Sequence, residues 1–412
     1  MSQLNSIMRI SALITVMIAL FFSLLVMVNT IPSEKIYDNT VKSMNIIDSE
    51  GLKKKIGNVF IFRLDNFTDA LMMNIAVGSD SDTPVKSSMK ATYHIADDDL
   101  STVTYAARCI ASNDDCNLQS VDYERYWHGY LVFLKPLLTV MDYGNIRVLN
   151  YMCFTILILS VCVLLYKKCD RKMLYTFLLS ILLINFWVVP LSMQFSTTFY
   201  ISFMASIALL LCKNKALPYI FTVIGCLTGF FDFLTTPLVT LGLPLVICLS
   251  YVEKPSNNKY KSLFKYSLLW FIGYSSVWVS KWIIAYFIIG YNITDAVNSV
   301  IGRASSDTFN GVDMSLTGLL RILYSNTSLF LVFVFIVVVF ILFNAVVYLK
   351  KAQKFKANAY LLLIASMPVV WFLVIRNHTI VHCWFVWRMF YVSLVAYILF
   401  LFKTLVKEKN SF

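Results

Sequence analysis

Hydrophobic residues in this chain come in long, nearly uninterrupted runs. Runs of roughly 18–25 apolar residues are long enough to cross about 30 Å of hydrocarbon as a helix. We count ten such segments, which predicts an all-α polytopic membrane protein with one transmembrane domain over residues 1–412. The expected spans are 9–29, 148–166, 173–191, 196–212, 217–234, 237–252, 264–289, 328–349, 357–375 and 385–403.

Two polar stretches separate these runs. The larger covers residues 30–147 and the smaller covers residues 290–326. With ten spans, both stretches fall on the same side of the membrane. We expect the first of them to be a large loop that contains juxtamembrane helices.

The distribution of charge predicts the orientation. One side of the membrane would carry Arg9, the short connections between spans and the C-terminal tail. These segments hold 18 of the 35 basic residues but only 3 of the 23 acidic ones, a net charge of about +15. The rest of the chain, with 17 basic and 20 acidic residues, carries about −3. Positively charged loops stay in the cytoplasm. We therefore expect both termini to be cytoplasmic and both polar stretches to be extracytoplasmic.

The composition agrees with this interpretation and excludes other classes. The chain is 58% hydrophobic and 14% charged, whereas a soluble domain carries about 25% charged residues. The net charge of +12 is an orientation signal, so we expect no nucleic-acid partner. The sequence contains no Walker loop and no GxGxxG motif, and the inner connections are too short for a nucleotide-binding domain.

Residues 65–69 are the first candidate site. If residues 66–77 form a helix, Asp65 and Asp69 lie four residues apart and one helical face can present both carboxylates. A general base or a metal-binding pair is one interpretation. Solvated acids at a helix start, with Asp65 as the N-cap, is the other.

An aromatic and basic cluster directly precedes the apolar stretch 131–140. Its candidate ligand-binding residues are Tyr126, Trp127 and His128. They are typical either of an interfacial aromatic belt or of a wall facing a sugar or a phosphate.

Two charges fall within apolar segments, where an ionised group is costly. Asp232 stands among aromatic residues at a hairpin, and Lys281 lies inside the seventh expected span. Lys281 has three interpretations: it extends outward to water, it pairs with Asp232, or it holds a phosphate.

The bridge between the last two expected spans carries further polar groups, namely Asn377, His378, His382 and Arg388. The two histidines are four residues apart, but no carboxylate completes a zinc signature. We therefore expect no metal site here and favour hydrogen bonding to a phosphate or a sugar. Arg303, in the smaller polar loop, is another candidate for an anionic ligand.

The cysteines say little about function. Most of the nine lie singly in apolar runs, where a thiol behaves as a small apolar group. Cys109 and Cys116 both lie in the first polar loop, and the sequence leaves open whether they are bonded.

The order of segments along the chain resembles that of the GT-C superfamily of membrane glycosyltransferases. One apolar span is followed by a large outer loop, which carries an acidic pair before a juxtamembrane helix, and then by a further series of spans. The chain is also similar to a group of bacterial membrane proteins, mainly Gram-positive. The similarity lies in the strings at 65–69, 126–129 and 231–234, and in Asn377-His378 with Arg388. The resemblance covers most of the chain, and it implies a multi-pass protein of the bacterial cytoplasmic membrane.

The resemblance further implies transfer of a sugar from a polyprenyl-phosphate donor to a glycan or lipid acceptor, with inversion. Asp69 or Asp65 would be the base. Lys281, Arg303, Arg388 or a histidine would stabilise the leaving phosphate. No nucleotide cofactor is expected, and a divalent cation (Mg or Mn) is compatible with the site. The alternatives are a polysaccharide polymerase or ligase, a transporter or flippase of a lipid-linked saccharide, and a non-catalytic assembly protein.

Overall fold

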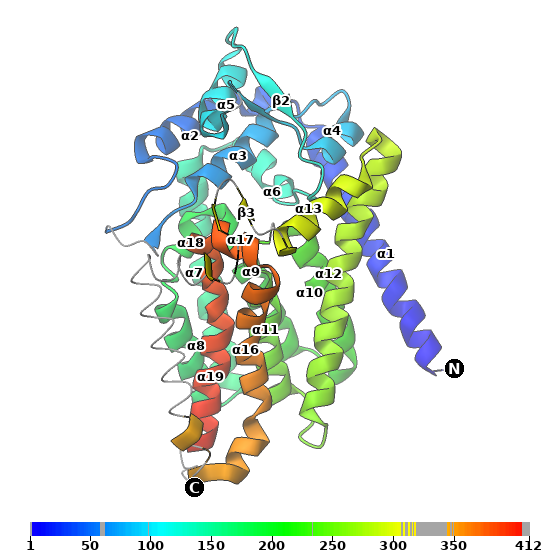
Figure 1. Cartoon of the computed structure of the whole chain (residues 1–412), viewed down its shortest axis with the longest axis vertical. Coiled ribbons are helices and arrows are strands. Elements are labelled where there is room, and N and C mark those ends of the chain that lie inside the picture. Colours follow the sequence, from blue (N-terminus) through cyan, green and yellow to red (C-terminus); the bar gives the residue numbers. More distant parts are fainter. Residues whose placement is uncertain are drawn as a thin grey trace.

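The computed structural model describes residues 2–57, 62–97, 99–232, 234–305 and 350–405, with short pieces at 308–309, 312–313, 315, 317–318, 344–346 and 348. About 79% of the chain is helical, which confirms the expected all-α class. A bundle of long helices is covered at one end by a compact cap (Figure 1). The cap comprises residues 30–142, between α1 (Ser2–Asn29) and α7 (Tyr143–Lys168).

Five helices in the described part of the chain are long and apolar enough to cross a membrane. They are Leu4–Asn29 of α1, α7, α9 (Met193–Leu211), α12 (Lys259–Ile289) and Cys383–Leu405, which joins α18 (Cys383–Val386) to α19 (Phe390–Leu405). A pair of helices bent by 65°, Lys350–Asn358 and α16 (Tyr360–Val374), makes a sixth if it is one span. These helices fit a membrane protein, but they do not confirm ten spans.

Three expected spans are short helices within the bundle. They are α8 (Arg171–Leu183), α10 (Leu217–Phe231) and α11 (Pro237–Ile247), which continues as a π-helical turn at Cys248–Val252. Proline sets two of the boundaries, because α10 and α11 both carry it in their first turn, where it is tolerated. All of α11 is buried, and α10 packs along α12. The expected span 328–349 lies almost wholly outside the described residues.

Within its described residues the cap contains five α-helices and one two-stranded sheet. The helices are α2 (Tyr37–Glu50), α3 (Asn66–Val77), α4 (Pro84–Lys90), α5 (Val103–Ser112) and α6 (Leu131–Leu138). Strands β1 (Tyr93–Ile95) and β2 (Gln119–Val121) pair antiparallel, and a disulfide joins Cys109 to Cys116. The helix expected at residues 66–77 is confirmed as α3. Most of its side chains are buried, and it lies inside the cap.

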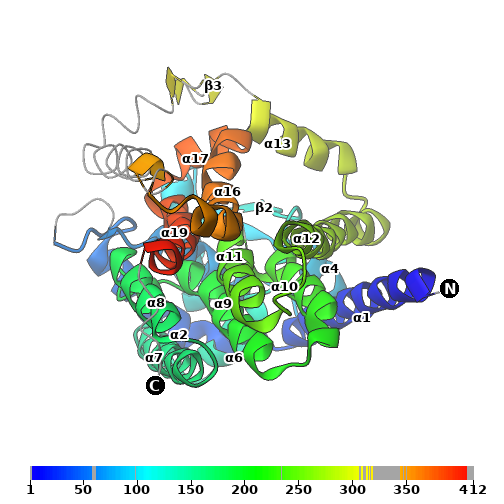
Figure 2. The same cartoon turned by 90° about the horizontal axis from the view of Figure 1, so that it is seen from below.

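Two hydrophobic cores meet where the cap sits on the bundle. One fills the bundle, and the other joins the cap to α1, α10 and α12. After α12 the chain forms α13 (Ile293–Ser305), which packs on α17 (Arg376–Val381), and the short pair β3 (Thr308–Phe309) and β4 (Val312–Asp313). Seen along the bundle from the end opposite the cap, α1 diverges from the other helices (Figure 2). The candidate residues gather at the junction of the two cores.

Candidate functional site

A cavity of about 570 Å³ lies between the cap and the bundle. Its walls come from six parts of the chain: residues 52–53, one face of α3, residues 100–101, the segment 123–130, the start of α9, and the segment 378–385. Five of the residues singled out in the sequence line it, namely Asp65, Tyr126, His128, His378 and His382. The fold thus brings residues more than 300 positions apart to one cavity.

Asp65 is the carboxylate of this cavity. It is the N-cap of α3, where Oδ1 accepts the Thr68 backbone N–H at 3.3 Å and Oδ2 accepts the Thr68 hydroxyl at 2.8 Å. Its exposed fraction is 1%, so the expectation of solvated acids was wrong, whereas the capping role is confirmed. Burial, with a contribution from the neighbouring Asp69, raises the pKa of Asp65 to about 6, against the opposing effects of the Thr68 hydrogen bonds and Lys53.

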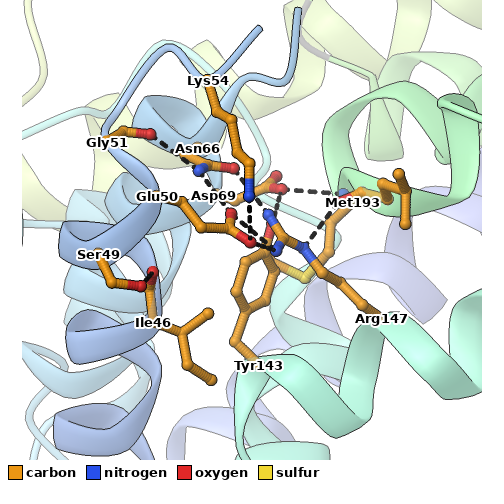
Figure 3. A network of polar contacts seen from close by, with 11 residues as sticks. Ile46, Ser49, Glu50, Gly51, Lys54, Asn66, Asp69, Tyr143, Arg147 and Met193 are labelled. Atoms are coloured by element: carbon orange, nitrogen blue, oxygen red, sulfur yellow. Dashed lines mark hydrogen bonds and ion pairs between the residues drawn. The ribbon is translucent and has the colours of Figure 1, made fainter. Parts of the chain in front are cut away.

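Asp69 faces away from the cavity, toward the start of α9. It accepts the backbone N–H groups of Met193 at 3.2 Å and of Gln194 at 3.3 Å, and it also accepts the hydroxyl of Tyr143 (Figure 3). Its carboxylate therefore satisfies two N–H groups that the first turn of α9 leaves unpaired. Asp65 and Asp69 are close in sequence, but only Asp65 lines the cavity.

A partly buried network supports this arrangement (Figure 3). Arg147 of α7 donates to Glu50 at 2.9 Å, to the side-chain oxygen of Asn66 at 2.7 Å and to the Leu191 carbonyl at 2.9 Å. Its guanidinium also stacks 4.2 Å from the Tyr143 ring centroid. The network ties α2, α3 and α7 to the segment before α9, and so fixes the position of α3.

His128 enters the cavity on a strained backbone. Its φ is +55°, a left-handed conformation that is uncommon outside glycine. Nε2 lies 2.8 Å from the Tyr123 carbonyl, which can only accept, so Nε2 carries the proton and donates it. Nδ1 lies 3.2 Å from the Tyr130 hydroxyl. Burial, with the charge of Lys281, lowers the pKa of His128 to about 3, which makes the imidazole neutral at physiological pH.

The neighbours of His128 attach this segment to the bundle. Trp127 donates its indole N–H to the Val277 carbonyl at 2.6 Å and does not line the cavity. Gly129 packs against Phe230, where an added Cβ would lie 2.6 Å from the carbonyl oxygen. Tyr126, in contrast, faces the cavity. The string 126–129 therefore combines cavity residues with packing residues.

His378 and His382 form another wall, with ring centroids 4.6 Å apart. His378 Nε2 donates to the Leu234 carbonyl at 2.9 Å, and His382 stacks on Phe385. Among the residues that the structure describes, no group of three His, Cys, Asp or Glu side chains is placed to hold a metal ion. Asn377 does not line the cavity but donates to the Gly302 carbonyl at 2.7 Å.

Lys281 does not have any of its three expected roles. It is fully buried, and its Nζ donates to the carbonyls of Ser88 at 2.9 Å and Met89 at 2.8 Å. These carbonyls are near the C-terminal end of α4, where a cation is favourable. The lysine thus fastens α4 to α12, without reaching Asp232, water or the cavity.

Asp232 and Arg388 are buried near the cavity but not in its wall. Asp232 Oδ1 accepts the Thr235 N–H at 3.1 Å, and Oδ2 has no hydrogen-bond partner among the described residues. Arg388 lies 3.9 Å from the Phe195 ring centroid and donates to the Trp384 carbonyl at 3.3 Å. Within the same described part of the chain its Nε and Nη2 have no partner. The side chain of Arg303, in α13, lies outside the described residues.

The structure adds cavity residues that the sequence did not single out. They include the aromatic residues Tyr123, Tyr130 and Trp384, the amide Gln194 and the cation Lys53. Lys53 Nζ lies 5.3 Å from the Trp384 ring centroid, within cation–π range. The cluster of aromatic residues around residue 126 was the sequence feature that came nearest to indicating these residues. Lys53 gave no signal, because it stands in an ordinary polar stretch.

A second, apolar hollow of about 390 Å³ lies beside the cavity, between α12, α13 and α16. Tyr126 lines both spaces. The hollow is lined mainly by aromatic and aliphatic groups, and among the described residues Arg125 is the one charged group in its wall. Phe271 and Val279 in its wall are also exposed on the bundle surface. The hollow therefore opens sideways, where lipid would surround the bundle.

No family model, curated protein or solved structure matches this chain.

Proposed function

We propose that this protein is a membrane glycosyltransferase that moves a sugar from a polyprenyl-phosphate donor to a cell-envelope glycan or lipid, with inversion. In this proposal the cap faces the extracytoplasmic side of a bacterial cytoplasmic membrane, the chain crosses ten times, and both termini are cytoplasmic. One observation carries it: Asp65 is a buried carboxylate in an aromatic cavity, with a pKa of about 6.

Asp65 is the better candidate for the base. The two oxygens of Asp69 already accept three hydrogen bonds from Tyr143 and α9. Asp65 accepts two bonds, both from Thr68, and keeps lone pairs for a substrate hydroxyl. A base with a pKa near 6 is ionised at neutral pH and is still basic enough to take a proton in the transition state.

The proposed reaction is a single displacement. Asp65 takes the proton of the acceptor hydroxyl as its oxygen bonds to the anomeric carbon. The bond from that carbon to the phosphate oxygen breaks, and the electron pair leaves on the lipid phosphate. Asp65 then releases its proton to solvent. No oxidant, reductant or nucleotide is required.

The two adjoining spaces support a lipid-linked donor. The sugar would occupy the aromatic cavity, where Tyr126 and Trp384 offer faces for stacking. The lipid chain would lie in the apolar hollow, which opens sideways, with the phosphate near Arg125. Arg388, buried near the cavity, is a second source of positive charge for the leaving group, because its Nε and Nη2 have no hydrogen-bond partner among the described residues.

The position of the cavity favours a transferase over a transporter. A transporter binds its substrate near the middle of the membrane, between two repeats. Here the carboxylate and three histidines line a cavity between the cap and one end of the bundle.

The test uses full-length protein in vesicles, a panel of labelled polyprenyl-phosphate hexoses, and an envelope glycolipid extract as acceptor. We expect release of polyprenyl phosphate with transfer of label, and loss of at least about 100-fold in Asp65→Asn, the scale of general-base catalysis. Asp115→Asn is the matched control, because Asp115 is an exposed acid of the cap that does not line the cavity. Addition of a chelator, then Mg or Mn, tests the divalent cation.

Full activity of Asp65→Asn would show that Asp65 is not the general base. Absence of transfer by the parent protein from every donor, with movement of the intact lipid-linked sugar across the vesicle membrane, would favour the transporter.

A further inference from the structure

A third hollow, of about 680 Å³, lies in the half of the bundle away from the cap, between α1, α9 and α10. It exists because α1 leaves the bundle along its N-terminal half (Figures 1 and 2). Leu25 of α1 is fully buried and Phe21 is 2% exposed, whereas Leu4 and Met8 are more than half exposed. The two halves of one apolar helix therefore have different surroundings.

The C-terminal half of α1 is held firmly. The Phe21 ring stacks on Phe230 of α10 with centroids 4.1 Å apart, and Asn29 donates to Ser88 of the cap at 3.0 Å. Farther from the cap, several residues that line the hollow are alanines, namely Ala12 on α1 and Ala205 and Ala208 on α9. Short side chains cannot bridge the diverging helices, so the space between them stays open.

The mouth of this hollow is positively charged. Arg9 lines it, and Lys213 and Lys215 are exposed in the α9–α10 turn, just before Ala216, which also lines it. None of the described residues that line the hollow is acidic. Within the described part of the chain, these three cations take part in no ion pair. The space thus has an apolar interior and a cationic rim at one end.

We propose that this hollow binds an anionic glycerophospholipid. The acyl chains would lie between α1 and the α9–α10 pair, and the headgroup phosphate would contact Arg9 with Lys213 or Lys215. Basic pockets between membrane helices on the cytoplasmic side bind anionic headgroups. With the orientation that the charge distribution predicts, this rim faces the cytoplasmic leaflet, which carries such lipids.

A lipid fits the site better than a protein helix does. The rim offers three cations to a partner, and an apolar helix brings no anion to meet them. Flexible acyl chains can also fill a hollow that widens as α1 diverges from α9 and α10. The site does not depend on the proposed transfer reaction, because it lies at the other end of the bundle from Asp65.

The test is lipid retention by the full chain, measured by native mass spectrometry. The protein is purified in a mild detergent and mixed with equal amounts of phosphatidylglycerol and phosphatidylcholine that carry identical acyl chains. We expect one tightly held phosphatidylglycerol per chain. The preference should fall by about tenfold or more in the triple variant Arg9→Ala, Lys213→Ala, Lys215→Ala.

The matched control replaces three other exposed cations that do not line the hollow, Lys167, Lys168 and Lys261, by alanine, and should keep the preference. Ala208→Phe tests the hollow itself, because Ala208 is exposed within it and a phenyl ring there would displace an acyl chain. All variants are compared at equal monodispersity and equal thermal midpoint, so that misfolding is not scored as lost binding.

Equal retention of both lipids by the parent protein would overturn the proposal, as would undiminished phosphatidylglycerol binding by the triple variant. A stoichiometric second polypeptide in the hollow, found by cross-linking from position 208, would also overturn it.

Discussion

Replacing Asp65 by asparagine should slow transfer by at least about 100-fold and, at neutral pH, stabilise the folded protein. Asp65 is buried, and its pKa is raised by that burial. Folding therefore destabilises the ionised form of Asp65, which is the form that the proposed reaction needs. Asparagine removes the charge, and it is as good an N-cap residue as aspartate. Its side-chain oxygen can still accept the Thr68 N–H, and the Thr68 hydroxyl can rotate to accept from the new amide.

The size of the effect follows from the pKa. A change from 3.8 to about 6 means that ionised Asp65 costs the folded state about 3 kcal/mol relative to the unfolded chain. Because the pKa in the folded state is raised, this cost is absent below about pH 4. It grows as the pH rises to about 6 and is constant above that. The gain in Asp65→Asn should follow the same curve, with about 3 kcal/mol as its upper limit.

The assay is the thermal midpoint of the purified protein in one detergent, for the parent and Asp65→Asn, at intervals from pH 4 to pH 8. The two midpoints should coincide at pH 4 and separate through pH 6, with the variant higher. Over the same range the transfer rate of the parent should rise through about pH 6, as the base ionises.

Asp69→Asn provides the contrast. Both oxygens of Asp69 accept N–H groups of α9, and one of them also accepts the Tyr143 hydroxyl. An amide nitrogen at either position would face a donor, which costs about 1–3 kcal/mol. Burial raises the pKa of Asp69 as well, so removing its charge offsets part of this cost. At pH 8 we therefore expect the thermal midpoint of Asp69→Asn to lie below that of Asp65→Asn. A lower midpoint for Asp65→Asn at pH 8, or a difference that does not change with pH, would refute the reasoning.

Three further predictions concern the junction of the cap and the bundle. Gly129→Ala should destabilise by about 1–3 kcal/mol, because its Cβ would lie 2.6 Å from the Phe230 carbonyl oxygen; a midpoint equal to that of the parent would contradict the close packing. Lys281→Met leaves two buried carbonyls of α4 without their donor, so hydrogen exchange of α4 should accelerate while the KM for the donor is unchanged; a raised KM would return Lys281 to the phosphate site. His128→Asn should lower the transfer rate without changing its pH profile above pH 4, because the pKa of His128 is about 3; a lost inflection near neutral pH would contradict this.

Much of the fold was readable from the sequence because membranes impose simple rules. Length and hydropathy predict spanning helices, and α1, α7, α9 and α12 are helices of that kind. Capping chemistry predicted the start of α3 at Asp65. Hydropathy does not fix the number of spans, because a proline or a turn shortens a buried apolar helix without changing its hydropathy. The helices α8, α10 and α11 illustrate this.

The sequence by itself determined which residue types are costly in this chain, and the tertiary structure decided how each is satisfied. Asp65 and Asp69 are indistinguishable as a carboxylate pair, yet one lines the cavity and the other caps α9. Lys281 is a buried charge in any reading, but only the packing of α4 on α12 shows that two carbonyls hold it. The physical reason is distance. Helical periodicity fixes neighbours three or four residues apart, whereas these partners come from elements more than 100 residues away.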